Sequence, residues 1–93
     1  MVMSAWLVRV EMKLLKFEAE WCTRCKQVDK VLETMTLPFP IERIDADKET
    51  GLLLEYGVRG IPHMILLDEN HNIVTRIGGV LNKQQLEEAF NLQ

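Results

Sequence analysis

The spacing of apolar residues predicts a strand, a helix and a second strand in the first half of the chain. Residues 14–19 form a strand in which Leu15, Phe17 and Ala19 share one face. Residues 22–35 carry an apolar stripe at i, i+3, i+4 and i+7, and the prolines that follow end this helix. Residues 41–45 read as a short strand.

The second half predicts a helix, a hairpin and a last helix. Residues 48–56 form a helix that stops at Gly57, a residue suited to the left-handed turn after a helix. Residues 64–67 are a continuous apolar run, typical of a strand covered on both faces, and residues 73–77 return as its hairpin partner after a polar turn.

A capping signal marks the start of the last helix. Asn82 is the expected N-cap, Gln85 follows three residues later, and Leu81 is placed to pack against Leu86. The order β-α-β-α-β-β-α predicts an α/β fold with a central mixed β-sheet flanked by helices, with parallel pairing first and a hairpin last.

Length, net charge and apolar content limit the number of domains and the kinds of partner that we expect for this chain. The 93 residues suit one domain, which we expect over residues 12–93, with residues 1–11 as an N-terminal tail or an extra edge strand. A net charge of −3 without a basic run argues against a nucleic-acid partner. No apolar stretch is long enough to span a membrane, and the first residues lack the basic start of a signal peptide. We therefore expect a cytoplasmic monomer, a setting in which two cysteines rarely form a permanent disulfide.

The segment Cys22-Thr23-Arg24-Cys25 places two thiols where a strand meets a helix. Unpaired N–H groups and the positive end of the helix dipole stabilise a thiolate at Cys22, and Arg24 acts in the same direction. Cys25 continues the buried stripe of the helix. Cys22 is therefore the expected exposed nucleophile and Cys25 the shielded resolving thiol, which would permit disulfide exchange through a Cys22–Cys25 disulfide.

The residues alone leave two other interpretations of this pair open. The cysteines can be small buried apolar side chains, or they can hold a metal. Zinc would need two further ligands, and the only histidines, His63 and His71, have spacings that fit no compact finger. We expect neither a metal nor a cofactor.

Three segments together resemble thioredoxin: WCTRCK at residues 21–26, YGVRGIP at 56–62 and IGG at 77–79. The resemblance runs from about Lys13 to Leu92. It implies a thioredoxin-like fold and a thiol–disulfide oxidoreductase that reduces protein disulfides. It also implies thioredoxin reductase as the electron donor and disulfide-bearing client proteins as partners.

The resemblance also implies roles for residues around the cysteines. Ile61-Pro62 would be a cis peptide bond that faces the pair. The client-binding surface would comprise Trp21, Thr23, Arg24, Ile61, Gly78 and Gly79. For Trp21 the alternative is packing in the core.

The chain departs from the family pattern at several positions. Thr23-Arg24 stands where the family usually has Gly-Pro, and Lys16 stands where it has a buried aspartate that relays a proton to the resolving cysteine. Arg43 occupies the place of a lysine that partners this acid. We expect Glu18, on the strand face of Lys16, to pair with Lys16 and to take over the proton relay.

Two alternative functions stay open at this point. One is a glutaredoxin-like reductant coupled to glutathione, although Trp21 and Ile61 favour the thioredoxin type. The other is a thioredoxin-fold binding module whose thiols are idle or hold a metal.

Overall fold

A computed structural model describes residues 11–92 and confirms the predicted order of elements. The elements are β1 (Lys13–Glu18), α2 (Thr23–Glu33), β2 (Ile41–Asp45), α3 (Thr50–Tyr56), β3 (His63–Leu67), β4 (Ile73–Gly78) and α4 (Lys83–Ala89). The predicted tail or edge strand over residues 1–11 lies outside the described residues except for Glu11, so it stays a prediction. Within residues 11–92, no helix is long and apolar enough to cross a membrane.

The four strands form one mixed sheet in the order β2-β1-β3-β4. β1 pairs in parallel with β2, as expected for two strands joined by a helix, and antiparallel with β3. β3 and β4 form the predicted antiparallel hairpin. The two central strands, β1 and β3, are therefore the most deeply buried, and the cysteine pair follows directly from the end of β1.

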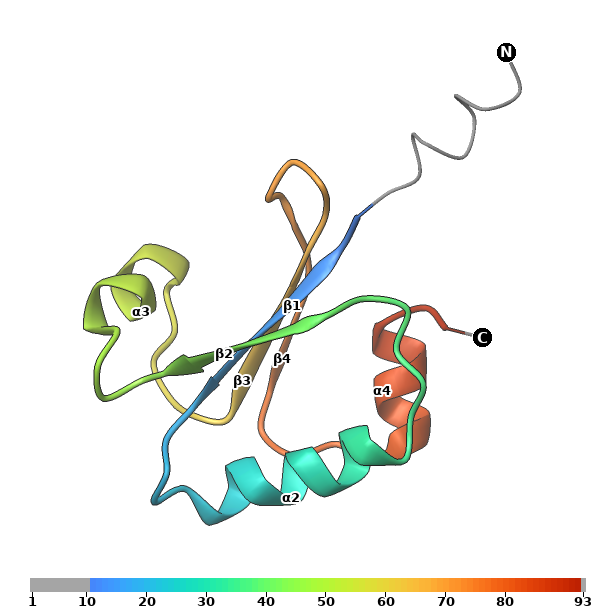
Figure 1. The fold of residues 1–93 in the computed structure, drawn as a ribbon, viewed down its shortest axis with the longest axis horizontal. Helices are drawn as coiled ribbons and strands as arrows, with labels where there is room; N and C mark the ends of the chain where they lie inside the picture. The colour runs from blue at the N-terminus through green and yellow to red at the C-terminus, as the bar shows by residue number, and fades with distance from the viewer. Residues whose placement is uncertain (1–10, 93) are drawn as a thin grey trace.

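Helices cover both faces of this sheet (Figure 1). On one face, α2 and α4 pack on a core that includes Leu14, Val28 and Leu86. On the other face, α3 covers a second core around Leu15 and Phe17. Alternate residues of β1 thus point to opposite cores, and this alternation directs Lys16 and Glu18 towards α2.

The bounds of α2 and α3 differ from the predicted ones because of hydrogen bonds at the helix ends and in the turn before α3. α2 starts at Thr23 because Cys22 is its N-cap, and it ends before the C-cap Thr34. α3 starts two residues later than predicted because Asp45 organises the preceding turn: its carbonyl accepts from the N–H groups of residues 48 and 49, and its side chain accepts from the Asp47 N–H. The predicted capping box of α4, between Asn82 and Gln85, is present.

Candidate functional site

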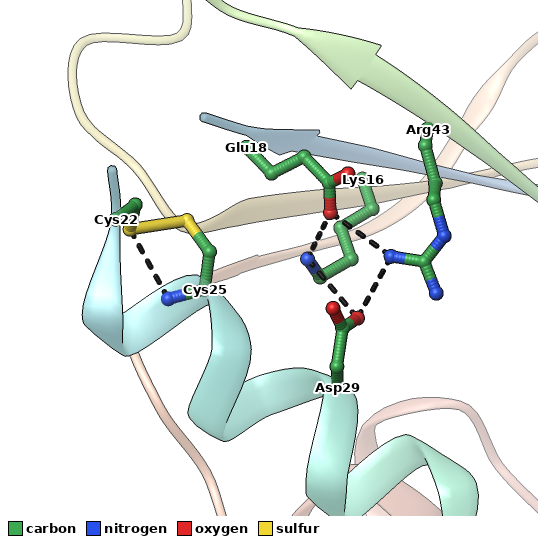
Figure 2. A network of polar contacts seen from close by, with 6 residues as sticks. All are labelled: Lys16, Glu18, Cys22, Cys25, Asp29 and Arg43. Carbon is green, nitrogen blue, oxygen red and sulfur yellow. Dashed lines mark hydrogen bonds and ion pairs between the residues drawn. A yellow bond between two sulfur atoms is a disulfide. The ribbon is translucent and has the colours of Figure 1, made fainter. Parts of the chain in front are cut away.

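The two cysteines lie at the N-terminus of α2 and are joined by a disulfide (Figure 2). Cys22 is the N-cap in an extended conformation, and its Sγ accepts a hydrogen bond of 3.1 Å from the Cys25 N–H. The Cys22 N–H donates to the Ala19 carbonyl, which closes the turn after β1. The Cα atoms of the cysteines are 5.3 Å apart, within the usual range for a disulfide. One sulfur therefore occupies the position at which a helix end stabilises negative charge.

The predicted contrast between an exposed Cys22 and a shielded Cys25 is wrong in this disulfide form. Cys22 is 5% exposed and Cys25 is 2% exposed. Both belong to a small cluster with Ala19, against which Ile61 packs. The turn after β1 and the Ile61 side chain thus cover both residues, and position on the helix, rather than exposure, distinguishes them.

The loop before β3 meets the loop after β4 beside this cluster. The Ile61–Pro62 peptide bond is cis. The Pro62 carbonyl accepts a hydrogen bond of 3.0 Å from the N–H of Gly79, whose φ of 83° is a left-handed conformation that favours glycine. The structure therefore brings Ile61, Pro62 and Gly79 together from segments that are distant in the sequence.

Trp21 lies on the surface next to the disulfide and is 68% exposed. Its Nε1 donates a hydrogen bond of 2.8 Å to Asp47 Oδ2, in the turn before α3. This position excludes core packing, the alternative left open by the sequence. Thr23 and Arg24, in the first turn of α2, are also exposed.

Four charged side chains form a closed ring beside the disulfide, which we call the charge ring: Lys16, Glu18, Asp29 and Arg43 (Figure 2). Lys16 is fully buried, and its Nζ contacts Glu18 Oε1 and lies 3.2 Å from Asp29 Oδ1. Arg43 Nη1 lies 2.9 Å from Glu18 Oε1 and 2.8 Å from Asp29 Oδ1. Each cation therefore contacts both carboxylates.

The expected pair of Lys16 and Glu18 is present, but sequence reasoning missed Asp29. Register explains how the cations meet, because Lys16 of β1 is directly opposite Arg43 of β2. Asp29 comes from α2, four residues after Cys25, and therefore lies one turn along the same helix face. The four-residue spacing between Cys25 and Asp29 was the one feature of the sequence that pointed to Asp29.

Contacts within the charge ring shift the pKa values of two of its members, Asp29 and Arg43. Burial would raise the pKa of Asp29, but the hydrogen bond from Arg43 and the charges of Lys16 and Arg43 outweigh it and lower this pKa below its ordinary value. The hydrogen bond to Asp29 raises the pKa of Arg43, with further contributions from the charges of Asp29 and Glu18. Asp29 is thus held as an anion at neutral pH.

A hollow of about 320 Å³ lies beside Cys25 and the charge ring. Cys25 and both carboxylates of the ring share its wall, which comprises Glu18, Ala19, Glu20, Cys25, Lys26, Asp29 and Asp45. This volume is large enough to hold water. Cys25, Glu18 and Asp29 therefore line one shared hollow.

His63, the residue after Pro62, takes part in a separate contact. Arg76 Nη1 lies 3.2 Å from His63 Nε2, which must be the acceptor because a guanidinium only donates. Arg76 also donates to the Tyr56 carbonyl at the end of α3. Burial, followed by the charge of Arg76, lowers the pKa of His63. This contact ties the start of β3 to β4 and α3.

Comparisons with known proteins agree on one family. The family model described as Thioredoxin matches residues 5–91. The chain is 32% identical over 83 residues to a thioredoxin of Buchnera aphidicola subsp. Baizongia pistaciae (strain Bp), a match that covers 85% of this chain and 75% of that protein.

Solved structures of thioredoxins have the same fold. A mutant thioredoxin from Halobacterium salinarum NRC-1 superposes with a TM-score of 0.75 at 29% identity, and the match covers 84% of this chain and 70% of that one. The reduced desulfothioredoxin from Desulfovibrio vulgaris Hildenborough gives a TM-score of 0.76 over 89% of this chain and 82% of its own. At 19% identity, this second likeness supports the fold alone.

Proposed function

The chain belongs to the thioredoxin family, and we propose that Cys22 is its attacking thiol and Cys25 its resolving thiol. The protein is a thiol–disulfide oxidoreductase with protein-disulfide reductase activity. The observation that supports this division of roles is the Cys22 sulfur at the N-cap of α2, where it accepts the Cys25 N–H. A thiolate at that position gains a hydrogen bond and the favourable end of the helix dipole.

The reaction proceeds in two exchanges. The Cys22 thiolate attacks one sulfur of a client disulfide, forms a mixed disulfide and releases the other client sulfur as a thiolate. Cys25 then loses its proton and attacks the Cys22 sulfur. This step forms the Cys22–Cys25 disulfide and releases the second client thiolate, so the client gains the two electrons that the protein gives up.

The loops around the disulfide form the proposed client-binding surface. The exposed Trp21 indole, held by Asp47, offers apolar area beside Cys22. Ile61 packs on the cysteine cluster, and Pro62 is tied to Gly79 by a hydrogen bond. We assign to this surface the residues that the resemblance implied: Trp21, Thr23, Arg24, Ile61, Gly78 and Gly79. Pro62 keeps its separate role in the cis-proline loop that faces the cysteine pair.

Glu18 is the proposed acceptor of the Cys25 proton. It shares the wall of the 320 Å³ hollow with Cys25, and its side chain is 24% exposed. Replacement of Glu18 by glutamine keeps the shape and removes the base. A general base contributes about 100-fold or more, so Glu18→Gln should slow the second exchange strongly while the first is unchanged.

Family membership implies an electron-donating reductase and disulfide-bearing client proteins. We propose that the donor is a thioredoxin reductase and that the protein acts as a cytoplasmic monomer without a cofactor. We further propose that the protein has no nucleic-acid partner, in keeping with the net charge of −3.

Reduction of insulin disulfides tests the proposed function. The wild type should accelerate precipitation of reduced insulin with dithiothreitol as donor, and Cys22→Ser should abolish this acceleration. Coupling to glutathione and glutathione reductase should support little turnover. If the C22S variant retains full activity, the proposed roles are wrong, and efficient coupling to glutathione would instead assign a glutaredoxin-type function.

A further inference from the structure

We infer that Asp29 is a positioning residue for the second exchange, because it offsets the charges of Lys16 and Arg43 and so keeps both cations from acting on the Glu18 carboxylate alone. The inference rests on the proposed role of Glu18. It concerns a residue of α2 for which neither the motifs nor the family resemblance assigns a role.

The contacts of Glu18 show why a second carboxylate is needed. One oxygen, Oε1, contacts both Lys16 Nζ and Arg43 Nη1. Opposite charges at such distances favour the ionised form of a carboxylate, so two cations acting on Glu18 alone would make it a weak base. Lys16 is fully buried, and water therefore screens its charge little.

Asp29 offsets both cations at once. Its Oδ1 lies 3.2 Å from Lys16 Nζ and 2.8 Å from Arg43 Nη1, the same two nitrogens that contact Glu18. The charge ring therefore holds two positive and two negative charges and is neutral overall. The lowered pKa of Asp29 keeps it ionised at neutral pH, so its compensating charge is present there.

The same geometry separates the tasks of the two carboxylates. Asp29 is one helical turn from Cys25 and lines the hollow with Cys25 and Glu18. When Cys25 attacks the mixed disulfide, its proton passes to the Glu18 carboxylate, which becomes the neutral acid. Asp29 stays an anion throughout. After the Cys22–Cys25 disulfide has formed, Glu18 returns the proton to solvent through the hollow.

Two substitutions that change the net charge of the ring in opposite directions test this inference. Asp29→Asn makes the ring positive, and Arg43→Gln makes it negative. Reduced protein is mixed with an aromatic disulfide in a stopped-flow instrument. The first aromatic thiolate then reports the attack by Cys22, and the second reports the attack by Cys25. The rate of the second release is followed against pH for the wild type, each variant and the control Glu33→Gln, which removes an exposed carboxylate from the same helix.

The inference predicts shifts of opposite sign in the second release. Asp29→Asn should move the midpoint of its pH dependence down by about one unit, and Arg43→Gln should move it up by about one unit. The double variant D29N/E18Q should behave like E18Q alone, and E33Q should match the wild type.

Shifts in the same direction, or no shift in either variant while E18Q slows the second release, would overturn the inference and leave the role of Glu18 intact. An E18Q variant with unchanged kinetics would instead remove the proposed relay itself, and the inference with it. The Arg43 side chain is half-exposed, so the R43Q variant should fold even if D29N does not. The direction of its shift in the pH dependence then tests the inference by itself.

Discussion

Replacement of Asp29 by asparagine should cost the protein about 2 kcal/mol of unfolding free energy at pH 7. Asp29 lies 3.2 Å from the ammonium group of the fully buried Lys16. At an effective dielectric constant of about 20, one such contact is worth about 5 kcal/mol before desolvation is subtracted. Loss of the only partner of a buried charge costs about 3–5 kcal/mol, but Glu18 still contacts Lys16 in this variant. The expected loss is therefore smaller.

Urea unfolding followed by circular dichroism measures this loss. In a separate thermal melt, a loss of 2 kcal/mol would lower the melting temperature by about 8–16 °C for a domain of this size. Glu33→Gln serves as the control, because it removes a carboxylate from the exposed side of the same helix. If D29N loses less than about 0.5 kcal/mol, the typical range for surface substitutions, Asp29 does not stabilise the buried lysine and the reasoning fails.

The pH dependence of the same difference provides a second check. The pKa of Asp29 is lower in the folded protein than in the unfolded chain, so its contribution is complete above the unfolded value of about 4. This contribution should disappear as the pH falls through the folded value. The wild type and D29N should therefore converge in stability under acidic conditions, and a constant difference down to low pH would contradict the electrostatic explanation.

Three further predictions concern other parts of the fold. The pKa of His63 is lowered on folding, so the wild type should lose stability as the pH falls below about 6.5. His63→Gln should flatten this slope in urea titrations between pH 7 and 5, and equal slopes would contradict a partly buried imidazole that is neutral in the folded protein. Asn82→Ala removes the N-cap of α4 and should cost about 1 kcal/mol, whereas Asn82→Asp should restore most of it if capping is the cause. Leu86→Ala empties a fully buried position and should cost about 3 kcal/mol in the same titration; a loss below about 1 kcal/mol would show that the core there is not closely packed.

Local signals in the sequence predicted most of the fold. The apolar stripe of α2 and the capping box at Asn82 each depend on residues a few positions apart, and each appears where it was expected. The end of α2 comes at Glu33, two residues before the predicted end and ahead of the prolines. The start of α3 was misplaced because Asp45 uses its carbonyl and side chain to form a turn that propensity does not reveal. Turns of this kind decide where a helix starts, and residue propensities do not report them.

The site was predicted only in part for a similar reason. The cysteine spacing located the disulfide, and the alternation along β1 placed Glu18 beside Lys16. Asp29 was missed because its partners come from two strands and meet it only after α2 has packed on the sheet. The burial of Cys22 was missed because Ile61, a residue distant in the sequence, covers the cluster.

Trapping of the mixed disulfide tests the central claim most directly. Cys22→Ser and Cys25→Ser are each mixed, in reduced form, with a disulfide-bonded substrate such as insulin, and covalent adducts are measured by mass spectrometry without reductant. If Cys22 attacks first, C25S should accumulate an adduct through Cys22, and C22S should form almost none over the same time. An adduct that forms preferentially through Cys25 in the C22S variant would contradict the assignment of the two thiols.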